Sequence, residues 1–293
     1  MSVVLCENKN NMILTYKFES KILVEDRRTT SKNVKEIQQW LTTTCVPNLQ
    51  IETIALFLIA CDNDISATQT TIKNFFRIKS EAPEIFSNRD IDSVILTKTR
   101  QVLFACSLPK RLQNTVIHCY KLSETDHRNF VFSDIFKLGV MIVDVSQRYD
   151  PPDDLIAIID MEGLSLMHLT RLKPHIVKSF VDFLQDGMTL KIKNIHVLNT
   201  HYVAKKFVAV LKLFMKKALA DTLIVHPVGM KMEEFYEKYV PASHLPQEYG
   251  GELLSFSMLQ EISIQQLREL KPFFEAEDKL IIDYKSAKSQ IDK

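Results

Sequence analysis

The sequence predicts an α/β protein in which a small helical unit precedes a larger unit built on a mixed, largely parallel sheet. Helical patterns fill the chain from about residue 30 to residue 85. After residue 110, short β-branched apolar runs alternate with longer amphipathic segments. Apolar strands separated by helices are typical of parallel strands that are buried on both faces. A chain of 293 residues is long enough for one large domain, or for a small domain joined to a larger one.

Three segments predict the helical unit. The first has Thr30 or Ser31 as its N-cap, and apolar residues follow at helical spacing. The second, residues 51–61, is almost wholly apolar, so we expect a buried helix. The third has Ser66 as its candidate N-cap and ends near Pro83, because proline cannot continue the hydrogen bonding of a helix.

The larger unit is predicted from alternating strands and helices. We expect strands at residues 115–122, 155–160, 195–199 and 222–227. We expect helices at residues 133–149, 168–185, 202–220 and 231–239. The last segment is predicted to be helical up to Pro272, and then polar and loose.

Composition and charge argue against several classes of protein. The net charge of +1 gives no reason to expect a nucleic-acid partner. The first residues do not resemble a signal peptide, and no run approaches the about 18 apolar residues of a membrane-spanning helix. We therefore expect a cytoplasmic protein. We also expect free thiols, without any CxxC pair, at Cys6, Cys45, Cys61, Cys106 and Cys119.

No motif of the sequence predicts an enzyme. The chain lacks the GxSxG nucleophile elbow, the GxxxxGK[ST] phosphate loop and the GxGxxG dinucleotide motif. His196 and His201 flank a strand end, while His168 and His175 lie two turns apart on one predicted helix. Neither spacing suits a metal site, so we interpret these residues as polar or hydrogen-bonded histidines. We expect no catalytic residue, no metal and no cofactor.

The segment "DMEG" at residues 160–163 is the strongest acidic candidate. Asp160 ends an apolar strand and Glu162 follows two residues later, a pattern that acid–base chemistry could use. The favoured interpretation is a turn that ends the strand. In that turn, Asp160 accepts hydrogen bonds from nearby backbone N–H groups and Gly163 lets the chain change direction.

Three motifs in order resemble the CRAL-TRIO lipid-binding family. They are "IIDMEG", "IKNIHVLNT" and "LPQEYGG", and the likeness extends over about residues 30–255. The resemblance implies a helical N-terminal domain and an α/β domain whose sheet floors an apolar cavity under a mobile gate helix. It also implies a structural role for the glycine pair of "LPQEYGG", as a sharp turn after the last short helix. The implied divisions are an extension at 1–29, a helical domain at 30–95, a lipid-binding domain at 96–255 and a helical tail at 256–293.

The gate implied by the resemblance falls on residues 203–219, which are predicted to form one amphipathic helix. Phe207, Leu211, Phe214 and Ala218 share one face of that helix. Lys205, Lys212 and Lys216 lie nearly opposite, with Lys206 and Lys217 on one flank. Such a pattern fits an ordinary surface helix. An apolar face opposite an unpaired cationic stripe also fits a helix that contacts an anionic membrane.

The cavity wall is predicted from strand alternation together with the resemblance. Alternation places Leu155, Ala157 and Ile159 on one face and Ile156 and Ile158 on the other, and both faces are apolar. Periodicity does not decide between them, whereas the resemblance favours the first set. The predicted lipid-binding residues are Val140, Met141, Leu155, Ala157, Ile159, Phe180, Phe183, Leu184, Met188, Ile195, Val197, Phe207, Val210, Leu211, Phe214 and Met215.

Lys191 and Lys193 match two positions that hold a phosphoinositide headgroup in some members of the family. Two exposed lysines on a strand edge are also ordinary solvated charges. The chain departs from those members at Ile59 and Cys61, which stand where they have charges, and at Leu213, which replaces a proline. The predicted membrane or phosphoinositide contacts are Lys191, Lys193, Lys205, Lys212, Lys216 and Lys217.

The resemblance implies a cytoplasmic, non-enzymatic carrier of a retinoid, tocopherol, carotenoid or similar lipid, with peripheral membrane association. Two alternatives stay open at this point. The first is a phosphatidylinositol or phospholipid exchange protein. The second is an interaction module that keeps the fold without transporting a lipid.

Overall fold

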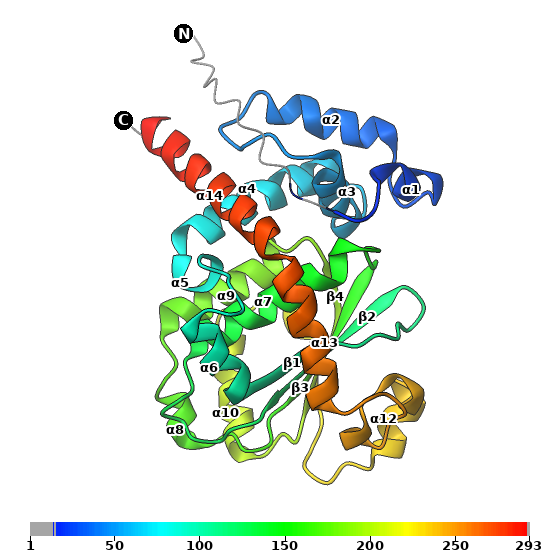
Figure 1. Ribbon diagram of the computed structural model, residues 1–293, viewed down its shortest axis with the longest axis vertical. Coiled ribbons are helices and arrows are strands. Elements are labelled where there is room, and N and C mark those ends of the chain that lie inside the picture. The colour runs from blue at the N-terminus through cyan, green and yellow to red at the C-terminus, as the bar shows by residue number, and fades with distance from the viewer. Residues whose placement is uncertain (1–13, 15, 292–293) are drawn as a thin grey trace.

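The structure is a computed structural model that describes residue 14 and residues 16–291 (Figure 1). Its first helices form the predicted helical unit at one end of the molecule. The Thr30 side chain caps its second helix by accepting from the N–H of Asn33. Asp64, rather than Ser66, caps the fourth helix by accepting from the N–H of Ala67. The helices are α1 (Ser20–Glu25), α2 (Ser31–Leu41), α3 (Ile51–Ala60), α4 (Ile65–Glu81) and α5 (Pro83–Phe86).

A five-stranded sheet forms the centre of the second unit. Its strands are β1 (Leu103–Ser107), β2 (Thr115–Leu122), β3 (Asp154–Asp160), β4 (Lys191–Leu198) and β5 (Leu223–Val225). They lie side by side in chain order, with β1 antiparallel to β2 and the other pairs parallel. The mixed, largely parallel sheet is thus confirmed. Strand β1 was not predicted, because it is short and follows α6 (Val94–Val102) without a turn.

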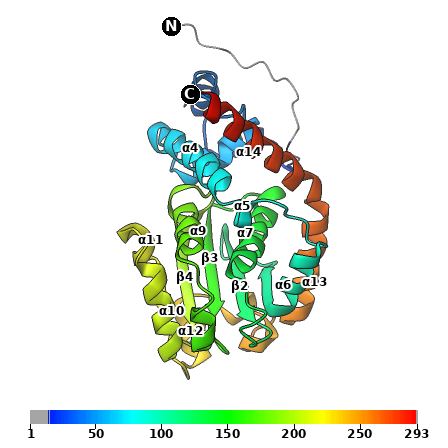
Figure 2. The ribbon, with the colours of Figure 1, turned by 90° about the vertical axis from the view of Figure 1, so that its left-hand side faces the viewer.

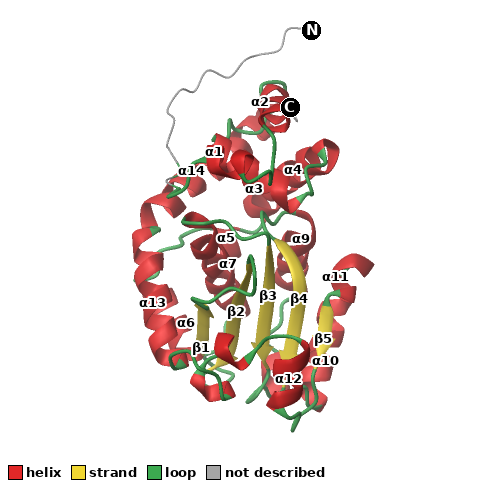
Figure 3. Cartoon of the chain, turned by 90° about the vertical axis from the view of Figure 1, so that its right-hand side faces the viewer, coloured by secondary structure: helices red, strands yellow, loops and turns green. Residues whose placement is uncertain are grey.

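Helices cover both faces of the sheet. Figure 2 shows one face beneath α7 (Phe132–Arg148), α9 (Pro174–Asp186) and α10 (Tyr202–Lys212). Figure 3 shows the opposite face, where α12 (Met232–Lys238) lies in front of the strands and α13 (Phe256–Glu269) lies beside β1. Two predicted helices are divided. Residues 168–185 separate into α8 (Leu166–Leu169) and α9, and residues 202–220 into α10 and α11 (Lys217–Asp221).

The prediction of a loose tail after Pro272 is wrong. The chain continues as α14 (Lys271–Ile291), which packs against α4 of the helical unit. Pro272 is the second residue of this helix, where a missing N–H costs no intrahelical hydrogen bond. The two residues after it, Phe273 and Phe274, are buried.

Buried charges hold α14 in place. The Glu277 carboxylate lies 2.8 Å from Lys79 Nζ on α4 and 2.6 Å from Arg89 Nη1. Arg89 also contacts the carboxylate of Asp278 at 2.6 Å. Burial by itself would raise the pKa of Glu277, but Lys79 and Arg89 outweigh it and hold that pKa at about 2. Ion pairs with charged side chains from distant parts of the chain therefore hold α14 in place.

The glycine pair makes the sharp turn that the sequence predicts. Gly250 has a φ of 69°, in the left-handed region that favours glycine. A Cβ on Gly251 would lie 2.0 Å from the carbonyl oxygen of Leu245, so the backbone passes too close for any side chain. The N–H of Leu253 then donates to that same oxygen at 3.0 Å. The turn fixes the segment between α12 and α13.

Candidate functional site

An apolar cavity of about 170 Å³ lies between the sheet and the helices α7, α9 and α10. Leu155, Ala157 and Ile159 of β3 line its floor, together with Ile195 and Val197 of β4. On the other side of the same strands, Ile156 and Ile158 pack beneath α12 and α13. The residues of β3 that face the cavity are therefore Leu155, Ala157 and Ile159, the set that the resemblance favoured.

Most of the predicted lining residues lie in the wall of this cavity. They are Val140, Leu155, Ala157, Ile159, Phe180, Leu184, Met188, Ile195, Val197, Phe207, Leu211 and Met215. They come from α7, two strands, α9 and the segment around α10, which are far apart in the sequence.

Four predicted lining residues lie elsewhere. Met141 is fully buried in a separate cluster with residues of α13 and α14, because it lies on the side of α7 that faces away from the cavity. Phe183 points toward the helical unit, where its ring packs against Phe75 and Phe86. Val210 and Phe214 are half-buried and do not line the cavity.

Sequence reasoning missed an aromatic wall made by Phe130, Phe132 and Phe136. The ring of Phe136 stacks on Phe180 with centroids 3.4 Å apart, and Phe132 meets Phe207 at 5.6 Å. These contacts join α7 to α9 and α10 across the cavity. The spacing of Phe132 and Phe136, four residues apart on one helix face, was the signal that could have predicted this wall.

The expected continuous gate helix is broken at residues 213–216. The Gln185 side chain, at the end of α9, accepts from the N–H of Lys216 at 2.9 Å and donates to the carbonyl of Phe214 at 3.3 Å. This side chain satisfies backbone groups that a helix would otherwise pair internally. Because the helix breaks, Ala218 is exposed instead of sharing the apolar face with Phe207.

The predicted lysine contacts fall into two groups. Lys205 and Lys212 have exposed side chains that form no ion pair within the described part of the chain. Lys216, by contrast, lies 2.6 Å from the carboxylate of Asp186 on α9. The prediction that the lysines of this segment have no acidic partner is therefore wrong for Lys216. The other pairs are Lys217 with Asp221 at 2.5 Å, Lys191 with Asp62 at 2.7 Å and Lys193 with Asp154 at 3.8 Å.

The three motifs that carry the resemblance meet at one buried carboxylate. Asp160 accepts from Asn199 Nδ2 at 2.7 Å and from Tyr249 Oη at 2.9 Å. It also accepts from the N–H of Glu162 at 2.9 Å and lies 3.1 Å from Lys121 Nζ. Burial by itself would raise the pKa of Asp160, but these hydrogen bonds and Lys121 outweigh it and lower that pKa. The carboxylate thus serves the predicted strand-ending turn and joins three segments.

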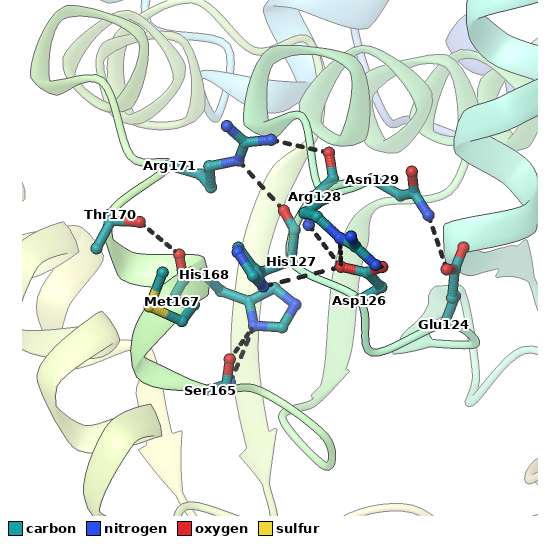
Figure 4. Close-up of polar contacts among 10 residues, drawn as sticks. All are labelled: Glu124, Asp126, His127, Arg128, Asn129, Ser165, Met167, His168, Thr170 and Arg171. Atoms are coloured by element: carbon teal, nitrogen blue, oxygen red, sulfur yellow. Dashed lines mark hydrogen bonds and ion pairs between the residues drawn. The ribbon is translucent and has the colours of Figure 1, made fainter.

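Polar contacts join the loop at 123–131 to the segment around α8 (Figure 4). Arg171 donates to the carbonyl oxygens of His127 at 3.2 Å and Arg128 at 2.8 Å. The ring of Phe130, which lines the cavity, meets the buried His168 with centroids 4.9 Å apart. Burial, with His127 nearby, lowers the pKa of His168, so this imidazole is neutral at pH 7. The two segments are therefore joined by an arginine that bonds backbone carbonyls and by the contact of Phe130 with His168.

Of the other histidines considered from sequence, His196 and His201 are held by hydrogen bonds. His196 Nδ1 lies 3.0 Å from His226 Nε2 on the sheet face opposite the cavity. The His201 side chain accepts from the N–H of Val203 at the start of α10. His175 is exposed on α9. Among residues 14 and 16–291, no three His, Cys, Asp or Glu side chains are grouped closely enough to hold a metal ion.

Two further sequence predictions concern the thiols and the membrane. Cys45, Cys61, Cys106 and Cys119 are free, while Cys6 lies outside the described residues. In the part of the chain that the structure describes, no helix is both long and apolar enough to span a bilayer.

Family models match most of the chain. A model described as the CRAL/TRIO domain matches residues 108–251, which include every strand except β1. A model described as a Pinta-like UBA domain matches residues 26–96, which include α2 to α5. The region expected to be the family's helical N-terminal unit therefore has its own family model.

Individual relatives match shorter segments. The human alpha-tocopherol transfer protein-like protein is 33% identical over 97 residues, which are 33% of this chain and 28% of the relative. Clavesin-1 from Rattus norvegicus is 25% identical over 130 residues, 43% of this chain and 36% of the relative. The chain thus spans about a third of each curated relative. The crystal structure of Sfh5 superposes with a TM-score of 0.49 at 15% identity, covering 70% of this chain and 84% of that one.

Proposed function

This chain belongs to the CRAL/TRIO family, and we propose that it is a carrier that holds one small hydrophobic lipid in its cavity. The observation that supports this most is the cavity itself, whose wall is almost wholly apolar and is built from the strands of the sheet together with α7, α9 and α10. Burying about 300 Å² of a ligand's apolar surface there would contribute ~7 kcal/mol, at ~25 cal/mol per Å². Micromolar binding requires about 8 kcal/mol, so apolar contact supplies most of the necessary free energy.

The size of the cavity suggests that the carrier opens to load. Sites for drug-sized ligands usually have volumes of roughly 300–1,000 Å³, and this cavity has about 170 Å³. A retinoid or tocopherol would therefore need the wall to move outward. The break at residues 213–216 is the natural hinge, because α10 supplies Phe207 and Leu211 to the wall while α11 continues beyond the break.

The same segment is the proposed contact with an anionic membrane, which would give a cytoplasmic protein a peripheral membrane association. Leu213, at the hinge, is 80% exposed, and the exposed Lys205 and Lys212 lie on the adjoining helix. Each basic residue near an anionic surface contributes ~1 kcal/mol of attraction. A phosphoinositide headgroup at Lys191 and Lys193 would have to compete with Asp62 and Asp154, which lie 2.7 Å and 3.8 Å from the two ammonium groups. This pairing weakens the phospholipid-exchange alternative.

Charge reversal tests the membrane contact. Lys205→Glu combined with Lys212→Glu should weaken binding to phosphatidylserine-containing liposomes roughly tenfold or more at low salt. The effect should shrink at high salt, where screening removes it. Liposome sedimentation would measure it. The control is Lys32→Glu with Lys35→Glu on α2, which makes the same charge change on the helical unit. Equal losses in both variants would contradict a contact specific to α10.

Mass spectrometry tests the carrier itself. Protein purified from cells would be extracted with organic solvent and compared with a mock preparation. One lipid enriched at a near one-to-one ratio would support a carrier, and its headgroup would separate a small isoprenoid from a phospholipid. If no lipid is enriched, even after incubation with retinoids, tocopherols and phospholipids, the interaction module becomes the better explanation.

A further inference from the structure

A tyrosine and a histidine on β2 form a polar pair at the cavity wall. Tyr120 lines the cavity and is half-buried, and His118, two residues earlier, is fully buried behind it. The hydroxyl of Tyr120 lies 3.3 Å from His118 Nδ1 and 3.4 Å from the carbonyl oxygen of Gly139. Hydrogen bonds between oxygen atoms are usually about 2.5–3.0 Å long and those between nitrogen and oxygen about 2.7–3.2 Å, so both bonds of this hydroxyl are long.

His118, which supports Tyr120 without itself lining the cavity, also has an unsatisfied atom. Its Nε2 atom is buried and has no hydrogen-bond partner among the described residues. Buried side-chain polar atoms rarely lack a partner, so this part of the wall is less well satisfied than an ordinary core. Burial lowers the pKa of His118 to about 3, so the imidazole is neutral at physiological pH.

The rest of the lining offers no free charge to a ligand. Lys121 and Asp160 are the charged residues in the cavity lining. Their side chains pair with each other at 3.1 Å, and Asp160 also binds Tyr249, which packs on the opposite face of the sheet. Strand alternation agrees, because Asp160 shares a face with Ile158 rather than with the cavity-lining Ile159. Apart from this ion pair, Tyr120 is the polar side chain among the residues that line the cavity.

We infer that the Tyr120–His118 pair is the polar subsite of the cavity and receives the hydroxyl or carbonyl oxygen of a neutral lipid. A phenol beside a neutral imidazole can either donate or accept, because the imidazole changes tautomer. A carboxylate or phosphate would enter an apolar wall without a cation to pair it, which is costly. The inference rests on the proposed carrier function and specifies the polar chemistry of its cargo.

Three probes with the same flexible chain test the subsite: farnesol, the hydrocarbon farnesene and farnesoic acid. Equilibrium dialysis at pH 7.4 would give the affinity of the full chain and of Tyr120→Phe for each. The variant keeps the ring and removes only the hydroxyl. Tyr202→Phe, whose side chain is 66% exposed on α10, is the control. Thermal unfolding would establish that all three proteins are folded.

In Tyr120→Phe, farnesol affinity should fall about fivefold to tenfold, while farnesene affinity should change less than about twofold. The native protein should bind farnesoic acid about a hundredfold more weakly than farnesol. Tyr202→Phe should match the native protein. Unchanged farnesol affinity in Tyr120→Phe, or equal affinity for the acid and the alcohol, would overturn the subsite alone. If no probe and no cellular lipid binds, the carrier function fails and the subsite fails with it.

Discussion

The same strands form both faces of the central sheet, yet one face borders a cavity and the other is covered by closely packed side chains. On the face beneath α7, α9 and α10, strand residues such as Ala157 border a cavity of about 170 Å³. On the face beneath α12 and α13, residues such as Ile158 are fully buried in a filled cluster. Both sets of strand residues are apolar, so the strands do not account for the difference. The helices above them do, because α12 and the turn after it bring Phe235 and Tyr249 down onto one face only.

Removing one large ring from each face should show the difference most strongly. Phe235 is fully buried against His196, His226 and Tyr239, so Phe235→Ala should cost about 3–5 kcal/mol of the free energy of unfolding. Phe180 borders the cavity and already lacks neighbours on one side, so Phe180→Ala should cost about half as much. Urea unfolding followed by circular dichroism would measure both. Equal costs would contradict the contrast between a filled face and a hollow one.

Adding a ring to neighbouring residues of β3 tests the same contrast from the other direction. Ile158→Phe enlarges a fully buried residue on the filled face and should cost about 1–3 kcal/mol. Ala157→Phe should occupy part of the cavity, so stability should change by less than about 1 kcal/mol while lipid affinity falls about tenfold or more. Unfolding and lipid-binding titrations would be compared. If Ala157→Phe costs as much as Ile158→Phe, the cavity is not available space.

The filled face should also make stability depend on pH. Burial, aided by His226, lowers the pKa of His196 to about 4. The unfolded chain, with an ordinary histidine pKa of about 6.5, therefore takes up a proton that the folded protein does not. Stability should be fully present above pH 6.5 and should fall as the pH drops toward 4, by up to about 1.4 kcal/mol per pH unit. His196→Gln removes one titrating group, so it should reduce this slope by up to about 1.4 kcal/mol per pH unit. Urea unfolding at several pH values would measure the slope, and an unchanged slope would contradict the assignment to His196.

Glycine substitutions should give the smallest effects, with opposite signs on the two sides. Gly139 lies within α7 on the cavity side, where a Cβ would make an ordinary 3.8 Å contact with Tyr120. Gly139→Ala should therefore stabilise the protein by about 0.5–1 kcal/mol. Gly250, with a φ of 69°, belongs to the turn that follows α12, so Gly250→Ala should destabilise it by about 1 kcal/mol. Thermal unfolding would test both signs, and a stabilising Gly250→Ala would contradict the strained turn.

Local residue patterns were sufficient to predict several strands and two of the turns. Strands β2 and β3 were predicted to within one residue, because continuous apolar runs between turn residues have few other interpretations. The turn at Asp160 and the sharp turn at Gly250 also followed from residue types with known backbone preferences. Alternation separated Ala157 from Ile158, although it did not say which of them would face a cavity.

Features that depend on contacts between distant segments could not be predicted from local patterns. The gate helix breaks because Gln185 of α9 binds the backbone near Lys216, and no local pattern contains that contact. The tail is ordered because Glu277 meets Lys79, 198 residues earlier in the chain. The alternation of residues along a strand predicts which of them share a face of the sheet. It does not predict which helices pack on that face. The hollow side of this sheet is therefore a property of how its helices assemble.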